Sequence, residues 1–483
     1  MVHPEGEQNT GRRGLSGMAK FITLKPRRFL VEFRDSRQAS VHGGQLAVAA
    51  LLEEFGLAER IEREPALDPR THRGKGYTPL VYVTQLLHCF TSGGVSLADA
   101  ERLNQDEPFK ALLGVEKLPD QTSIGEWLRD MGEPGWQALR RISRDFVQWA
   151  LARAEPGRYQ HLGRTECFFD DTQIEVSGPS FEGARINYQG QRALSWQLLL
   201  VGPFLADPIL GVTSESREGA LRDGAGQDGS CRLPELLEAN AHLWSQARSY
   251  LYADSASSAG HYLECIARYF GAWSVSYNRW TGPLEAKAAE LPESAWSEAE
   301  TTVWRDGTVQ TAQYGWFRYQ PGGCERPQRF AVVRHRAAEE LFWRYAFLTT
   351  HQQEGPARLA FEHHRLKGEK ERLLSELLRD LDLHHPPCQD LNANRSFYTL
   401  AGWAWNLMQA LKLLHLPEEE SPKRMRTLIR HLLMIPVELK RHARQLKACL
   451  YAPAGWVAWW RGLLEELLPR CRVLSGVGAV DSG

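Results

Sequence analysis

Three acidic residues stand where side chains from a buried sheet and a neighbouring helix could meet. Asp170 and Asp254 each follow a short apolar run typical of a buried strand, and Glu371 lies in a strongly charged helical segment. Phosphoryl transfer can use two divalent cations about 4 Å apart, and Mg²⁺ prefers carboxylate and water oxygens as ligands. The three acids therefore predict a phosphoryl-transfer site with two Mg²⁺ ions, for which Mn²⁺ would substitute.

Each acid taken alone also fits a structural role. An aspartate at the end of a strand often belongs to a turn or a cap, and a helical glutamate is usually solvated. The adjacent acids Asp170 and Asp171 also raise the question of a glycosidase. Neighbouring strand residues face opposite sides of a sheet, however, so this pair cannot flank one glycosidic bond.

The chain before the first acid has a helical pattern. Apolar residues recur at helical spacing over 46–55, and Gly56 predicts the end of that helix. A second helix is expected to begin at Ser123, because Ser123 and Glu126 have the spacing of a capping box. A turn over 118–122 precedes it, so the segment fits either a helix-turn-helix or an ordinary pair of helices.

Strand and helix patterns then alternate around the acids. Strands are predicted to end at Asp170 and Asp254, and a helix is expected between them. The later block alternates like antiparallel strands, and one further strand returns to the first sheet. The expected strands are 167–170, 196–201, 209–212, 249–253, 273–277, 301–304, 314–319, 330–333 and 345–348, and the expected helices are 232–246, 355–380 and 396–413.

These patterns predict five regions in a protein of mixed α and β structure. A chain of 483 residues is too long for one compact core. The regions are a basic arm (1–40), an α-helical domain (41–160), which would bind DNA ends if its helices form the helix-turn-helix, a catalytic α/β domain (161–271 and 340–415), a β-rich insertion (272–339) and a helical, basic C-terminal region (416–483).

Composition indicates an ordinary globular protein of 43% hydrophobic and 24% charged residues, with a net charge of −1. The first residues have no apolar core like that of a signal peptide, and no apolar run reaches the length of a membrane span. The eight cysteines form no CxxC pair, which argues against a zinc ribbon or a disulfide framework. We therefore expect a cytoplasmic protein with no membrane partner.

Positive charge is concentrated near the C-terminus. Between Ser421 and Leu450 the only acid is Glu438. This block is either a solvated face or a surface that contacts DNA phosphates, and we favour phosphate contact because the basic clusters flank an apolar segment that can dock on a core. The basic residues are Lys423, Arg424, Arg426, Arg430, Lys440, Arg441, Arg444 and Lys447.

Several motifs together resemble the DDE transposases of bacterial insertion sequences. The resemblance covers roughly residues 40–450 and is specific in combination, although each motif alone is short. It implies a ribonuclease-H-like core, a mixed sheet flanked by helices, with a β-rich insertion between the second and third acids. The motifs are 97–109, 169–178, 187–196, Tyr252-Ala-Asp254-Ser, 364–377, Ala393-Asn394-Arg395 and 435–440.

The resemblance makes Asp170, Asp254 and Glu371 the catalytic, metal-binding triad. Asp170 is preferred to Asp171 because the family places its ligand two residues before the threonine, here Thr172. The family's third motif has a tyrosine, an arginine, the glutamate and a distal lysine on one helix face. Here the equivalent residues are His364, Lys367, Glu371 and Leu378, so contact with the DNA phosphates is expected from His364, Arg365, Lys367 or Arg372.

Tryptophans in the β-rich block have two interpretations. The block has five tryptophans, most of which are expected to form the core of a small sandwich: Trp273, Trp280, Trp296, Trp304 and Trp316. Related transposases also stack an extruded base on a tryptophan of this insertion. We therefore predict that Trp304 or Trp316 is exposed and contacts DNA.

The expected function is cut-and-paste transposition by a homodimer or larger assembly, which cleaves double-stranded DNA at terminal inverted repeats and joins it to a target. In the cell such a protein would be cytoplasmic and associated with the bacterial nucleoid when bound to DNA. Two alternatives remain open: a structure-selective nuclease with the same core, and a domesticated DNA-binding regulator with an inactive site.

Overall fold

The computed structural model describes residues 36–187, 189–212, 232–277, 281–303, 307–352, 354–442 and 445–467. The chain divides into two units, Met1–Ser36 and Arg37–Gly483, and the elements below lie in the second. Nearly all of the predicted basic arm lies outside the described residues. No helix in the described part of the chain is long and apolar enough to span a membrane.

The first part of this unit is helical, as the pattern predicts. Gly56, with a φ of 73°, ends the first helix at the predicted position. The helix expected at Ser123 begins at Gln121 instead, because the Asp120 carboxylate accepts a hydrogen bond from the Ser123 amide at 2.7 Å and so provides the N-cap. The helices are α1 (Gln45–Phe55), α2 (Leu57–Glu62), α3 (Pro79–Thr91), α4 (Leu97–Arg102), α5 (Glu107–Leu113), α6 (Gln121–Asp130) and α7 (Gly132–Arg153).

A mixed sheet forms the centre of the molecule. Its long strand β3 (Arg164–Glu175) pairs antiparallel with β5 (Arg192–Val201), which pairs antiparallel with β6 (Phe204–Val212). On its other side β3 pairs in parallel with β7 (Ser249–Ala253), and β7 pairs in parallel with β8 (Ala272–Tyr277). The short strands β2 (Gln160–His161) and β4 (Arg185–Ile186) pair with β3 and β5.

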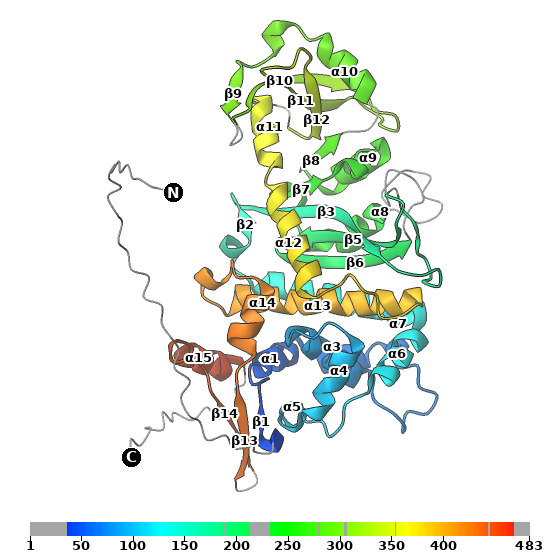
Figure 1. Cartoon of the computed structure of the whole chain (residues 1–483), viewed down its shortest axis with the longest axis vertical. Helices are drawn as coiled ribbons and strands as arrows, with labels where there is room; N and C mark the ends of the chain where they lie inside the picture. The colour runs from blue at the N-terminus through cyan, green and yellow to red at the C-terminus, as the bar shows by residue number, and fades with distance from the viewer. Residues whose placement is uncertain are drawn as a thin grey trace, which may run out of the picture. The chain divides into compact units, whose positions relative to one another are not determined.

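Alternation along the strands separates two cores. Phe168 points to the core that includes Leu374 and Leu377 of α12 (Lys367–Asp380). Its neighbour Phe169 points to the other core, which is covered by α8 (Leu233–Asn240) and α9 (Gly260–Tyr269). Figure 1 shows α12 crossing one face of the central strands. Helix α8 is shorter than the helix predicted over 232–246: it ends at Asn240 and is followed by two 3₁₀ turns.

The β-rich block extends this sheet and does not form a separate sandwich. Strand β12 (Arg344–Thr350) pairs with β8, as predicted for the returning strand, and β11 (Gln328–Ala337), β10 (Val309–Tyr319) and β9 (Glu300–Val303) follow in order. The predicted strand over 273–277 is therefore part of the central sheet. Its local alternation resembles that of the later block, and its parallel pairing with β7 shows that it belongs to the central sheet.

Two helices cover the extension. Leu284 and Ala288 of α10 (Thr281–Ala289) share a core with buried Trp296. Ala357 and Ala360 of α11 (Ala357–His364) pack with β-strand residues in another core. The tryptophan prediction is therefore mixed: Trp296 is buried in this core, Trp273 is buried in the central one, and Trp280 and Trp304 lie outside the described residues.

Helix α13 (Leu391–Leu414) lies between the sheet and the N-terminal helices. It packs against β6 on one side and against α3 and α7 on the other, and this burial all round explains its apolar sequence. Close approach requires a glycine here. A Cβ on Gly402 would lie 3.0 Å from Leu205 Cδ2 and 3.1 Å from Pro208 Cγ.

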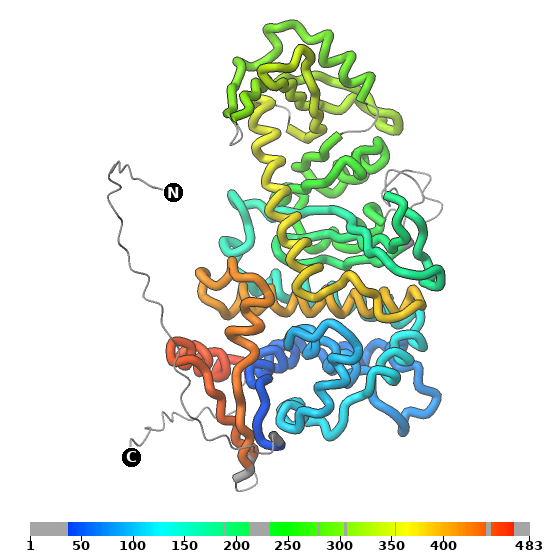
Figure 2. Tube along the Cα trace, viewed as in Figure 1, coloured from blue at the N-terminus to red at the C-terminus, as the bar shows by residue number. Residues whose placement is uncertain are grey.

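The C-terminal region is only partly helical, which corrects the prediction. After α14 (Met425–Leu428) and a π-helical turn (Ile429–Leu433), the strands β13 (Val437–His442) and β14 (Gln445–Leu450) form a hairpin, and α15 (Val457–Leu467) follows. Pro436 cannot continue a helix, and Val437 and Leu439 alternate with more exposed residues. The hairpin pairs with β1 (Ala39–Ser40), and Figure 2 shows these distant segments side by side.

Candidate active site

Asp170 and Asp254 come together through the register of two parallel strands. Phe169 and Ala253 are the last paired residues of β3 and β7, and an aspartate follows each of them. Asp254 then caps a 3₁₀ turn, with its Oδ1 accepting a hydrogen bond from the Ser255 amide at 2.6 Å. Asp170 does not end its strand, contrary to the prediction, because β3 continues to Glu175 along its other partner β5.

Asp170 and Asp171 have different surroundings. Asp170 shares the strand face of Phe168, which is the face covered by α12. The Asp171 Oδ2 accepts hydrogen bonds from Gln173 Nε2 at 2.8 Å and from Ser195 Oγ at 3.3 Å. The carboxylate of Asp171 is therefore engaged by its own sheet, and that of Asp170 lies on the side of the predicted helical glutamate.

Glu371 lies in the second turn of α12, and the predicted charged helix is interrupted before it. The segment predicted as one helix over 355–380 consists of α11 and α12, separated by Arg365 and Leu366. Lys367, at the start of α12, links two of the predicted acids. Its Nζ lies 2.9 Å from Glu371 Oε1 and 3.5 Å from Asp254 Oδ1.

The electrostatics confirm that these groups are close neighbours. Burial, helped by Asp171 and Asp254, raises the pKa of Asp170 to about 8, against the opposing effect of Lys367. Burial and the charge of Asp254 raise the pKa of Asp171 to about 6, although Ser195 and Gln173 oppose the shift. Burial alone would lower the pKa of Lys367, but Asp254, Glu371 and Asp170 together raise it. A surplus of negative charge is thus gathered around one ammonium group.

This donor set fits a hard cation. Carboxylate oxygens are the ligands that Mg²⁺ prefers, and the chain's own cation already lies between two of them. Within the described residues, no group of three or more His, Cys, Asp and Glu side chains is arranged closely enough to hold a metal ion. Two of the carboxylates, those of Asp254 and Glu371, are instead paired with Lys367.

His364 is held inside the protein. Its Nδ1 lies 2.7 Å from Ser274 Oγ and its Nε2 lies 2.8 Å from Ser276 Oγ, so both ring nitrogens have partners on β8. Burial, with a contribution from Lys367, lowers the pKa of His364 to about 4. The ring fastens the end of α11 to the sheet, and the predicted contact of His364 with a DNA phosphate stays a prediction.

The other residues predicted to contact DNA lie at the surface where they are described. Arg365 and Arg372 are exposed. Lys440 and Lys447 are exposed and lie directly opposite each other in the β13–β14 hairpin. Arg444 and the side chain of Arg441 lie outside the described residues.

Trp316 is half-buried and already has partners. Its indole N–H donates to the Gly355 carbonyl at 2.9 Å, and the Arg329 guanidinium lies 3.9 Å from its ring centroid. One face of the ring therefore carries a cation, which is an arrangement that also attracts a stacked base. Trp304, the other predicted tryptophan, lies outside the described residues.

A second polar cluster lies beside the acids and is not predicted from the sequence. Glu166, on the same strand face as Asp170, accepts a hydrogen bond from Tyr252 Oη at 3.0 Å and lies 3.2 Å from Lys370 Nζ. A cavity of about 240 Å³ opens next to it, lined by His161, Leu162, Arg164, Glu166, Tyr250, Tyr252 and His363. The spacing of Glu166, Phe168 and Asp170 predicts that these three residues share one strand face. The partners of Glu166, which are Tyr252 and Lys370, are distant in sequence, so the cluster itself cannot be predicted from the spacing.

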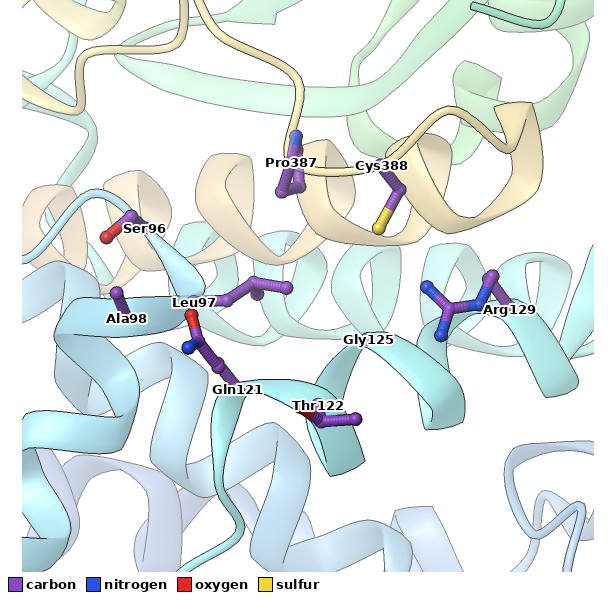
Figure 3. Close-up of a pocket in the computed structure, with 9 residues that line it drawn as sticks. All are labelled: Ser96, Leu97, Ala98, Gln121, Thr122, Gly125, Arg129, Pro387 and Cys388. Atoms are coloured by element: carbon purple, nitrogen blue, oxygen red, sulfur yellow. The ribbon is translucent and has the colours of Figure 1, made fainter.

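A larger pocket of about 440 Å³ lies elsewhere. Its walls come from α4 and α6 and from the segment with Pro387 and Cys388, as Figure 3 shows. None of the three acids lines it, so we place the candidate chemistry at the sheet and not in this pocket.

Comparison with protein families gives one result. A family described as "Transposase DDE domain group 1" matches residues 211–469, more than half of the chain. The matched segment includes Asp254, Lys367 and Glu371, and Asp170 precedes it. No curated protein matches the chain.

Proposed function

Because the chain belongs to the transposase DDE domain family of group 1, we propose that it is a cut-and-paste DNA transposase. It would cleave transposon ends at inverted repeats and join them to target DNA. The observation that carries the proposal is the convergence of Asp254 and Glu371 on one ammonium group beside Asp170. Family membership by itself supports DNA cleavage and transfer in general. We propose that the reaction takes place at Asp170, Asp254 and Glu371.

The strand order supports a ribonuclease-H-like core for this proposal. In the order β6, β5, β3, β7, β8, the first three strands are antiparallel and the last three are parallel. Two of the acids lie on adjacent parallel strands of this arrangement, and the third lies on the helix that covers them. The β-rich block lies between the second and third acids in the chain.

The proposed catalytic roles follow from position. Asp170, Asp254 and Glu371 would hold two Mg²⁺ ions, which would activate water or a DNA hydroxyl and stabilise the leaving oxygen. Lys367 contacts two of these acids, and Arg365 and Arg372 are exposed in the same segment of the chain; these three residues would bind the phosphates of the strand that is cut. Phosphate binding would hold the scissile bond against the carboxylates, which supplies orientation for the reaction.

DNA would also contact surfaces away from the acids. Lys440 and Lys447 are cross-strand partners, and the Glu438 carboxylate lies 3.1 Å from Lys440 Nζ. Like charges directly opposite each other are unfavourable, so a phosphate bound at Lys447 would add to the compensation that Glu438 gives to Lys440. Trp316, with Arg329 on its ring, is the described candidate for stacking on an extruded base. Pairing of two ends would require a dimer or a larger assembly.

Incubation of the purified protein with Mg²⁺ and the DNA that flanks its gene tests the proposal. Nicked, double-cut and joined products are expected from the wild type. Alanine variants of Asp170, Asp254 and Glu371 should bind the ends without cutting them. The matched control is Glu369→Ala, which removes an exposed acid from the same helix and should cut normally.

The same assay separates the alternatives. Cleavage without any joined product would identify a structure-selective nuclease. End binding by a wild-type protein that neither cuts nor joins DNA would identify a regulator with an inactive site. Loss of end binding in all three alanine variants would assign the acids a structural role.

A further inference from the structure

Lys367 is placed as a cation among the candidate metal ligands. Its ammonium nitrogen lies 2.9 Å from Glu371 Oε1 and 3.5 Å from Asp254 Oδ1. These distances are those of close ion pairs. The two acids come from different elements, the end of β7 and the second turn of α12, so the lysine ties the helix to the sheet at this point.

The position of Lys367 is enclosed, whereas the acids are more open. The side chain of Lys367 is 13% exposed, against 44% for Asp254 and 51% for Glu371. The aromatic ring of Phe168 lies 5.8 Å from its Nζ on the sheet side. The free sides of the two carboxylates thus face solvent, from which a hydrated divalent cation and a DNA phosphate would arrive.

Lys370 provides a comparison on the same helix. It lies one residue before Glu371, but its Nζ pairs with Glu166 at 3.2 Å, away from the predicted triad. Both lysines are largely buried and both are ion-paired. Lys367 alone of these two contacts the candidate ligands, so an effect of its charge on cation binding can be separated from a general effect of a lysine on α12.

We propose that Lys367 occupies the cation position between Asp254 and Glu371 when no metal is bound, and that a divalent cation must displace its ammonium group to bind. This inference rests on the metal site of the proposed function. A divalent cation and an ammonium group cannot share the same carboxylate oxygens, because like charges at such distances repel strongly where solvent is restricted. Lys367 would thus preserve the arrangement of the acids and also compete for them.

Displacement has a consequence for DNA binding. The released ammonium group becomes available to a DNA phosphate, and a phosphate that attracts Lys367 leaves the carboxylates available to a cation. Because binding linkage is reciprocal, DNA and the divalent cation should each strengthen the binding of the other. Lys367 would therefore favour assembly of the metal site when DNA is present.

Calorimetric titration of the full-length protein with Ca²⁺, an oxygen-seeking divalent cation, tests the competition without any readout of activity. Lys367→Gln should bind Ca²⁺ about ten-fold more tightly than the wild type, since the competing charge is gone. Lys367→Arg retains the charge and Lys370→Gln removes a charge elsewhere, so both should bind Ca²⁺ with wild-type affinity. Equal or weaker binding by Lys367→Gln would overturn the proposal.

The wild-type protein offers a second measurement that does not depend on the folding of a variant. Adding a short duplex with the flanking end sequence should tighten Ca²⁺ binding several-fold, and Lys370→Gln should show the same gain. No gain in the wild type would contradict the exchange. Absence of Ca²⁺ binding in every protein, including Lys367→Gln, would instead remove the metal site of the proposed function and this inference with it.

Discussion

Phe169 and Ala253 are the last register pair of the parallel strands β3 and β7, and the acids Asp170 and Asp254 are the next residue of each strand. Parallel strands in register place equivalent positions side by side. Asp171, one residue further along β3, turns to the opposite face and bonds to Gln173 and Ser195. The pairing of two apolar residues thus determines which carboxylates meet.

Replacement of Asp170 and Asp171 should therefore have unequal effects. Asp170→Asn should lower the cleavage rate by at least about a hundred-fold, because it removes a carboxylate from the proposed metal site. Asp171→Asn keeps a side chain that can bond to Ser195 and Gln173, and its rate should stay within about ten-fold of the wild type. Single-turnover cleavage with saturating DNA measures both. A larger loss for Asp171→Asn would reverse the assignment.

Acid should weaken the fold through His364. Its pKa in the folded protein is lowered from the usual 6.5 to about 4 by burial between Ser274 and Ser276. The neutral ring is therefore the stable form, so its stabilisation is complete above about pH 6.5 and is lost as the pH falls towards 4. The loss is at most about 3 kcal/mol.

Urea unfolding of the wild type and His364→Gln at several pH values measures this effect. Glutamine can bond to both serines but does not titrate, so the variant should lose less stability between pH 6.5 and 4. His88, whose pKa burial lowers to about 3, is present in both proteins and cancels in the comparison. Parallel pH profiles would show that His364 does not titrate in this range.

Neutralising the β13–β14 hairpin should weaken DNA binding in a salt-dependent way. Glutamine at Lys440, Arg441, Arg444 and Lys447 should flatten the plot of log affinity against log salt by about 0.9 for each phosphate that the hairpin no longer neutralises. Binding titrations at several salt concentrations give the slope. The control is Lys287→Gln, since this lysine is paired with Glu290 and lies outside the basic block. An unchanged slope in the hairpin variant would show that the hairpin is a solvated surface that does not contact DNA phosphates.

Trp316 should affect the steps that follow first-strand cleavage. Trp316→Ala removes a ring whose stacking on a base is worth about 1–3 kcal/mol, so second-strand cleavage should slow while nicking persists. Trp316→Phe retains an aromatic face and should recover part of the rate. Fluorescence of 2-aminopurine at the transposon end reports base extrusion. Wild-type behaviour of alanine variants at both Trp316 and Trp304 would exclude this pair from base stacking.

Gly402 should tolerate no large side chain. Gly402→Leu would force atoms against Leu205 and Pro208, between α13 and β6, and should destabilise the protein by about 2–3 kcal/mol. Gly462 is also helical, in α15, but a Cβ there meets nothing within 4 Å. Gly462→Leu is the matched control and should change stability by less than about 0.5 kcal/mol. Chemical denaturation compares the two.

Local features of this chain can be predicted from the sequence because their causes are local. The helix that ends at Gly56 depends on apolar spacing and on one residue with a positive φ. The strands before Asp170 and Asp254 are predicted from short apolar runs. The predicted returning strand over 345–348 is confirmed by the pairing of β12 with β8. Local patterns mislead where two signals compete. Asp120 rather than Ser123 caps α6, and the C-terminal region, which is predicted to be helical, forms a hairpin of two strands after Pro436.

Long-range pairing decided the rest. Trp273–Tyr277 alternates like the later β block, and only its parallel pairing with β7 makes it a central strand. Lys367 and Glu371 have the spacing of an i,i+4 pair, but the Asp254 partner of Lys367 and the serine partners of His364 come from segments that spacing cannot connect. The sequence by itself predicted phosphoryl transfer at Asp170, Asp254 and Glu371. Tertiary structure alone placed a lysine between two of them, because opposite charges from β7 and α12 meet only when the sheet and helix pack.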